Sequence, residues 1–91
     1  MLPGNSLIVV SKDQVSCELA DEVAILSLKD HIYYGLNPVG ARVWQLLQKQ
    51  MTLAALFDTL LSEYDVDANH LERDLNDLLN TLAQQGLVEI S

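Results

Sequence analysis

Histidine, cysteine and glycine residues carry much of the known metal, nucleophilic and phosphate chemistry of proteins, and they are few in this sequence. His31, His70 and Cys17 show neither the C-x₂-C nor the H-x₃₋₅-H spacing of zinc sites. Gly35 and Gly40 do not make a phosphate-binding loop, and they suit a strand end and a close helix contact. We expect Cys17 to be a small buried apolar residue. The sequence therefore predicts no catalytic residue, no metal site and no cofactor, and a protein that is not an enzyme.

Acidic residues gather in the second half of the chain. Residues 51–91 hold eight Asp or Glu and a single base, Arg73, whereas residues 1–50 have a net charge of −1. Asp74 and Asp77 are three positions apart, a spacing at which like charges on a helix cost a few tenths of a kcal/mol. Two interpretations follow: a solvated helix face that keeps the protein soluble, or an acidic rim that receives a basic peptide.

The overall composition excludes several classes of protein. The 91 residues carry a net charge of −8, with 49% hydrophobic and 20% charged residues, which is typical of one small globular domain spanning 1–91. That acidity disfavours a nucleic-acid partner, and no apolar run approaches the ~20 residues that span a membrane. The N-terminus lacks a secretory signal, and a single cysteine fits a reducing compartment, so we expect a cytoplasmic protein.

Short β-branched runs in the first part of the sequence predict strands. Residues 7–10 form a possible leading strand, and residues 15–19, 23–28 and 32–36 are joined by connections short enough for an antiparallel meander. The third strand of this meander lies at a sheet edge with one side unpaired. Tyr33 points to the opposite face from its neighbours in that strand and could either pack or bind.

Leucine-rich stretches at helical spacing predict three helices in the second part. Asn37 followed by proline, Thr52 and Asp67 are helix caps, and Gly86 ends the third helix, leaving a short tail. Trp44 lies on the apolar side of the first helix and is expected in the core. No apolar stripe can be buried alone, so the helices must pack together and under the sheet. The predicted fold class is α+β, a three-stranded antiparallel sheet followed by a three-helix bundle.

One stretch of the chain resembles a known family. The pattern Y-Y-G-L-N-x-x-G-x-x-x-W, from Tyr33 to Trp44, is similar to the PqqD-like family, the leader-peptide recognition domains of ribosomally made, modified peptides. Agreement continues through residues 64–67 and 86–88 and covers roughly residues 7–90. The resemblance implies a domain similar to a winged helix-turn-helix, which is in line with the order of elements expected from periodicity.

The resemblance also implies a function, which is to bind the leader of a precursor peptide and deliver it to modifying enzymes. In the family the leader lies between the third strand and the third helix and adds one strand to the sheet, a mode in which main-chain groups of an open edge capture an extended peptide. Carried onto this sequence, the implied peptide-binding residues are Leu28, Ile32, Tyr33, Tyr34, Asp74, Asp77, Leu78 and Thr81.

The same resemblance narrows the choice of biosynthetic pathway in which the protein works. A free-standing domain of this length is similar to the recognition proteins of lasso-peptide clusters, which work beside a separate leader peptidase and a cyclase. Leaders in such clusters offer tyrosine, proline and leucine anchors with lysines nearby, which suits an apolar cleft with an acidic rim. Family members of pyrroloquinoline-quinone synthesis carry a Pro-Glu pair in the sheet region that this chain lacks. A peptide chaperone of that pathway stays as the alternative.

Two further classes of function remain open. A winged-helix shape permits a DNA-binding protein, whose recognition helix would fall within residues 67–85. That segment holds Arg73 as its single base against four acids, so a duplex would repel it. A structural dimerisation domain is the other class, and nothing in the sequence distinguishes it from a peptide-binding module.

Overall fold

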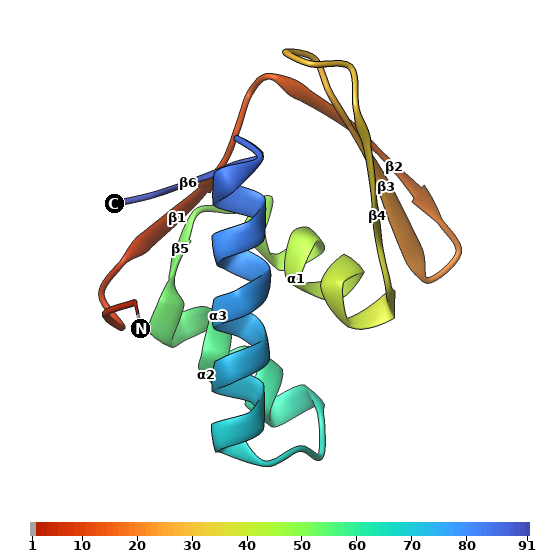
Figure 1. Cartoon of the computed structure of the whole chain (residues 1–91). Coiled ribbons are helices and arrows are strands. Elements are labelled where there is room, and N and C mark those ends of the chain that lie inside the picture. Colours follow the sequence, from red (N-terminus) through yellow and green to blue (C-terminus); the bar gives the residue numbers. More distant parts are fainter. Residues whose placement is uncertain (1) are drawn as a thin grey trace.

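The computed structural model describes residues 2–91 and arranges them as three helices and two small antiparallel sheets (Figure 1). The elements in chain order are β1 (Leu7–Val10), β2 (Gln14–Leu19), β3 (Glu22–Ser27), β4 (Tyr33–Leu36), α1 (Pro38–Leu47), β5 (Met51–Thr52), α2 (Leu53–Glu63), α3 (Ala68–Gln84) and β6 (Val88–Ile90). The predicted α+β class is confirmed.

The predicted meander is the sheet β2-β3-β4, and its bounds differ from the expected strands by one residue. Because β4 pairs with β3 alone, the prediction that the third strand lies at an edge is confirmed. Leu28 and Ile32 fall just outside the strands, in the connection between β3 and β4. That connection turns at His31, whose φ of 58° lies in the left-handed region. The side chains of both Leu28 and Ile32 are exposed at this end of the hairpin, beyond the ends of β3 and β4.

The segment after α3 is a strand and not the expected tail. Glu89 and Val88 of this strand, β6, pair with Val9 and Val10 of β1, and the other edge of β1 pairs with the short strand β5. Leu87 and Val88 are buried, so this end of the chain closes the core. Three residues are too few to show a strand period, and their partner lies at the other end of the sequence. Figure 1 shows β1 between β5 and β6.

Local cap chemistry begins and ends the helices much as predicted. The Asn37 side chain accepts a hydrogen bond from the Gly40 N–H at 2.9 Å, and Thr52 caps α2 in the same way. Gly86 ends α3 at a φ of 74°, as expected of a C′ glycine. Asp67 stands at the N-cap of α3, but its side chain makes no cap hydrogen bond. Within residues 2–91, no helix has the length and apolar character that crossing a bilayer requires.

The core forms where α1 covers one face of the β2-β3-β4 sheet. Val23 and Ile25 of β3 point into this core, together with Trp44 of α1, which is 2% exposed. The Trp44 Nε1–H has no hydrogen-bond partner, so the indole contributes through packing. Leucines from the apolar faces of α2 and α3 complete the same cluster. The expectation that Trp44 is a core residue is confirmed.

The expectation that Cys17 is buried is wrong. Cys17 pairs with Ala24, and alternation places both on the face opposite to Val23 and Ile25. Among residues 2–91 no helix covers that face (Figure 1), and the thiol is exposed. The sequence pattern showed which residues share a face but not which face the helices cover.

An ion pair joins α1 to the end of α2. Arg42 Nε and Nη2 donate to Glu63 Oε1 and Oε2 at 2.8 and 2.7 Å, a bidentate arrangement. The hydrogen bonds from Arg42 hold the pKa of the Glu63 carboxyl below its ordinary value of 4.5. The pair therefore stabilises the native state only while Glu63 is ionised.

Truncating the core tryptophan should destabilise the protein severely. We expect Trp44→Ala to lose about 3–5 kcal/mol, because it removes the largest buried side chain, and this is much of the ~5–15 kcal/mol that holds a typical domain folded. Trp44→Phe is the matched control and should lose less, since the indole N–H has no partner to forfeit. Urea unfolding measures both. A Trp44→Ala variant with the wild-type midpoint would place the indole outside the core.

The Arg42–Glu63 pair should make a small, pH-dependent contribution to stability. A carboxyl whose folded pKa is lowered stabilises the fold above the unfolded pKa, and that contribution is lost as pH falls through the folded pKa. Glu63→Gln should therefore lower the unfolding midpoint slightly at neutral pH, and the difference from wild type should vanish well below pH 4.5. Asp58→Asn, on the same helix, is the control. Equal differences at both pH values would contradict the assignment.

Candidate functional site

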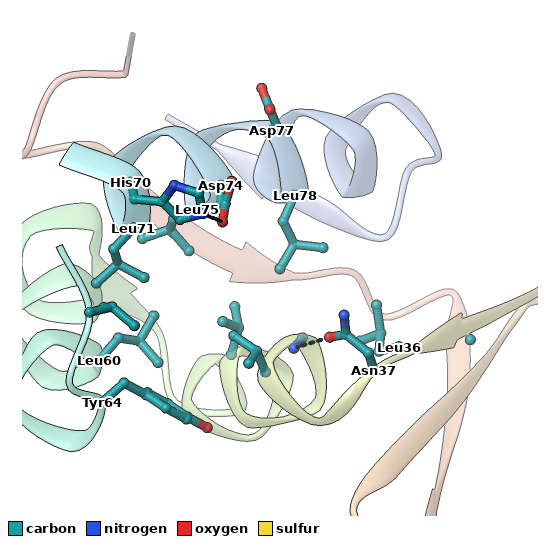
Figure 2. A pocket seen from close by; sticks show the side chains of 15 residues that line it. Leu36, Asn37, Leu60, Tyr64, His70, Leu71, Asp74, Leu75, Asp77 and Leu78 are labelled. Carbon is teal, nitrogen blue, oxygen red and sulfur yellow. Dashed lines mark hydrogen bonds and ion pairs between the residues drawn. The ribbon is translucent and has the colours of Figure 1, made fainter. Parts of the chain in front are cut away.

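A groove of about 600 Å³ opens where β4 meets α1 and faces α3 (Figure 2). It is called the groove below. Its lining residues come from the end of β4, the first turns of α1, the end of α2 with the loop that follows, and the first half of α3: Gly35, Leu36, Asn37, Val39, Gly40, Val43, Leu60, Tyr64, Val66, His70, Leu71, Asp74, Leu75, Asp77 and Leu78.

The interior of the groove is apolar. Leu36, Leu60 and Leu71 are buried residues of the core that also line it, so the groove is continuous with the hydrophobic cluster. Val39 and Val66, at 44% and 43% exposed, are apolar side chains that water reaches. Figure 2 shows Leu78 pointing from α3 across the groove toward α1. Such a hollow gains free energy by covering apolar groups of a ligand.

Acidic side chains border this hollow on α3. Asp74 Oδ2 lies 3.1 Å from His70 Nε2, one turn earlier on the same helix face. Asp77 is also exposed and points away from the interior in Figure 2. Thr81 lies one turn further along, and its hydroxyl donates to the Asp77 backbone carbonyl at 2.9 Å. The charges therefore lie at the rim, where water screens them, and the floor has none.

The free edge of β4 adjoins the groove and presents unpaired main-chain groups. The Ser27 N–H donates to the Ile32 carbonyl, so these two residues form a hydrogen-bonded pair. Hydrogen-bonded pairs alternate along an antiparallel ladder, and Leu26–Tyr33 is therefore a pair whose main-chain groups point outward. Gly35 lies two residues after Tyr33 in β4, so its pair with Ala24 also has main-chain groups that point outward. The N–H and C=O of Tyr33 and Gly35 thus face the open edge.

Tyr34 connects β4 to the far end of α3. Its hydroxyl donates to Gln85 Oε1 at 2.5 Å, across 51 positions of sequence. Desolvation and the nearby Asp30 carboxylate raise the pKa of the phenol above its ordinary value of 10.0, so it stays a protonated donor at neutral pH. This bond holds β4 at a fixed place beside α3, and Tyr34 positions the edge without lining the groove.

The structure divides the predicted site residues into two groups. Asp74, Asp77 and Leu78 line the groove, and the others lie around the edge and ends of β4 or further along α3: Leu28, Ile32, Tyr33, Tyr34 and Thr81. The side chain of Tyr33 is 72% exposed and projects from the face of the sheet opposite to Tyr34, so only its main chain faces the edge.

Sequence analysis missed much of the groove lining. The sequence pattern does not distinguish Val39 and Val66, which line the groove, from core residues. Val39 closely follows the N-cap of α1, and Val66 closely follows the end of α2. An apolar residue at the end of a helix in this way can indicate an apolar surface that is open to a ligand. His70 could have been paired with Asp74 from its i, i+4 spacing alone.

The chemistry that these groups offer is binding. Within residues 2–91, no group of three or more His, Cys, Asp or Glu side chains is placed to hold a metal ion. The groove combines a strand edge with open donors and acceptors, an apolar interior and an acidic rim. An extended chain with apolar side chains can satisfy all three features at once.

Comparisons with solved structures give two similar chains. The first, described as TbiB1 in complex with the TbiA(beta) leader peptide, is 40% identical, with a TM-score of 0.84 over 89% of this chain and 94% of that one. The second, described as lasso peptide synthetase B1 complexed with the leader peptide, is 23% identical, with a TM-score of 0.78 over 90% and 96%, and it shows the shared fold. No curated protein matches the sequence.

The family itself follows from the sequence pattern. Residues 22–88, which run from β3 to the start of β6, match the family described as coenzyme PQQ synthesis protein D. This stretch includes β4, α1, α2 and α3, the elements that build the groove. The chain belongs to the PqqD family.

Proposed function

We propose that this protein binds the leader of a ribosomal precursor peptide by adding it as a strand to β4, and that it catalyses no step itself. It would deliver the bound peptide to the leader peptidase and cyclase of a lasso-peptide pathway in the cytoplasm. The observation that carries the proposal is the open edge of β4 beside an apolar groove. The similar chain at 40% identity, solved with a leader peptide, supports it.

Strand addition uses the main-chain groups already described. A peptide lying along β4 pairs with the outward N–H and C=O groups of Tyr33 and Gly35. Leu28 and Ile32, exposed at the beginning of this edge, contact the peptide where it passes the hairpin connection. Main-chain pairing gives affinity for an extended chain of almost any sequence, so specificity must come from side-chain pockets.

The groove supplies those pockets. Apolar anchors of the leader enter between Leu78 of α3 and the exposed valines Val39 and Val66. Buried anchors of this kind are worth ~2 kcal/mol or more each, whereas exposed charge pairs are worth ~0.2–1 kcal/mol. Asp74 and Asp77, with Thr81 beyond them, meet lysines of the leader at the rim and set the rate and salt dependence of association.

Two alternatives have different support. The PqqD family is described by its role in PQQ synthesis, which favours a peptide chaperone of that pathway as the second candidate. DNA binding through α3 has no such support, because Glu72, Asp74 and Asp77 oppose a phosphate backbone and Arg73 is the one base of the helix. The same peptide-binding edge serves either precursor pathway.

Titration with a labelled synthetic leader peptide, followed by amide hydrogen exchange, tests the proposal. We expect saturable binding and new protection on the amides of Tyr33 and Gly35, because these donors become paired. Duplex DNA of similar length should not bind. Protection confined to α2, with none on β4, would place the peptide elsewhere.

A proline tests the main-chain part of the site. Tyr33→Pro removes an outward N–H and leaves the β3 ladder intact, so it should weaken leader binding. Tyr33→Ala is the matched control, since it removes the same side chain and keeps the donor. Equal binding by the two variants would exclude pairing at Tyr33.

The rim charges predict a salt-dependent effect. Asp74→Asn combined with Asp77→Asn should weaken binding of a lysine-containing leader several-fold at low salt and hardly at all at high salt, because exposed pairs are screened. Fluorescence anisotropy at two ionic strengths measures this. Glu89→Gln, an exposed charge in β6 and outside the groove, is the control. A loss that persists in high salt would mean that the two carboxylates are buried by the peptide.

A further inference from the structure

The groove contains an ion pair that depends on a proton. Asp74 Oδ2 lies 3.1 Å from His70 Nε2, and both side chains line the groove from α3 (Figure 2). The imidazole forms an ion pair with the carboxylate only while it carries a proton. Histidine is the side chain that gains or loses its charge within the physiological range of pH. The charge that stands beside Asp74 is therefore set by the pH.

Both members of this pair are accessible to a ligand. The side chains of His70 and Asp74 are 65% and 62% exposed, and neither makes another ion pair among residues 2–91. An ammonium group that enters along the groove can therefore reach the Asp74 carboxylate. It meets the imidazole there, because the two cations use the same acceptor.

The rest of the groove adds few charges to this pair. Of the lining residues that the structure describes, those from β4 and α1 are not ionisable, and the end of α2 with its loop adds Tyr64. Arg42 and Glu63, which join α1 to α2, pair with each other. Asp77 lies seven positions after His70, roughly 10 Å along the helix axis, a distance at which salt screens exposed charges.

Charges on neighbouring turns act on His70 in both directions. Asp65 and Asp67, exposed in the loop before α3, favour a cation at His70. Arg73, three positions later, and the positive end of the α3 dipole oppose it. Carboxyl, phenol and guanidinium groups ordinarily keep one charge state between about pH 5.5 and about pH 8. His70 is therefore the group whose proton can change the charge of the groove in this range.

We propose that a proton on His70 and a lysine of the leader compete for Asp74, so that the groove binds the leader more weakly as the pH falls. The inference rests on the proposed function, since it takes the leader in the groove as given. While His70 is neutral, Asp74 presents its full negative charge to the ammonium group. Once His70 is protonated, the imidazolium offsets that charge and repels the ammonium. His70 acts through Asp74 and needs no contact with the peptide.

Competition of this kind is reciprocal. If the neutral form of His70 binds the leader more tightly, thermodynamic linkage requires that leader binding release protons wherever His70 is partly protonated. Exposed charge pairs are weak, so we expect the affinity for the leader to be roughly two- to fivefold lower at about pH 5.5 than at about pH 8 in low salt. High salt should reduce this difference.

Fluorescence anisotropy at these two pH values tests the proposal, with a labelled, N-acetylated leader peptide that contains lysine and no histidine. The readout is the ratio of the two affinities for each protein. His70→Gln is uncharged at both pH values and Asp74→Asn lacks the shared carboxylate, so each should bring the ratio close to one. His31→Asn is the matched control. It removes the other histidine of the chain, asparagine tolerates the left-handed φ of 58°, and the wild-type ratio should be kept.

Two further measurements use the wild-type protein alone. The same leader with glutamine in place of lysine should bind with a ratio close to one. Calorimetry near neutral pH, in two buffers of different ionisation enthalpy, should show proton release when the lysine leader binds. A wild-type ratio of one, a wild-type ratio kept by His70→Gln, or the same ratio with the glutamine leader would each overturn the inference. Failure of the wild type to bind the leader at either pH would instead count against the proposed function.

Discussion

The tight corner between β4 and α1 is the constraint on which the binding surface depends. Leu36 is buried at the end of the strand, and α1 begins two residues later under the Asn37 cap. A Cβ on Gly40 would lie 3.3 Å from both Asn37 Oδ1 and Leu36 Cβ, closer than ordinary van der Waals contact, so glycine lets the helix start this close to the strand. α1 therefore continues below the strand edge and forms one wall of the groove, and the Tyr34–Gln85 hydrogen bond fixes the opposite end of β4 to α3.

A strand held in this way can bind but has little with which to react. The strand contributes main-chain donors and acceptors that are already held in an extended conformation. Most of the conformational entropy lost on binding is therefore lost by the peptide. Burial of a few apolar side chains of the peptide in the groove then gains free energy, and the carboxylates of the rim add mainly long-range attraction. This distribution of roles explains why a chain with so few nucleophiles and metal ligands can still select a partner.

Local signals made much of this architecture predictable. Asn37, Thr52 and Gly86 mark helix ends through chemistry within a few residues, and the meander follows from short connections between β-branched runs. Pairing of β6 with β1 was missed because it joins the two ends of the chain through three residues. The exposure of Cys17 was missed for a related reason: alternation groups residues by face, but only the tertiary packing of α1 decides which face is covered.

The free edge of the β2-β3-β4 sheet lets a bound peptide become part of the surface that the domain presents. The edge offers main-chain donors and acceptors, and a strand added there widens the sheet beyond β4. Any enzyme that contacts both the domain and the bound peptide would bind the loaded domain more tightly than the empty one, and linkage then requires that the enzyme tighten peptide binding by the same factor. A protein of 91 residues can thus couple recognition to delivery without moving any element of its fold.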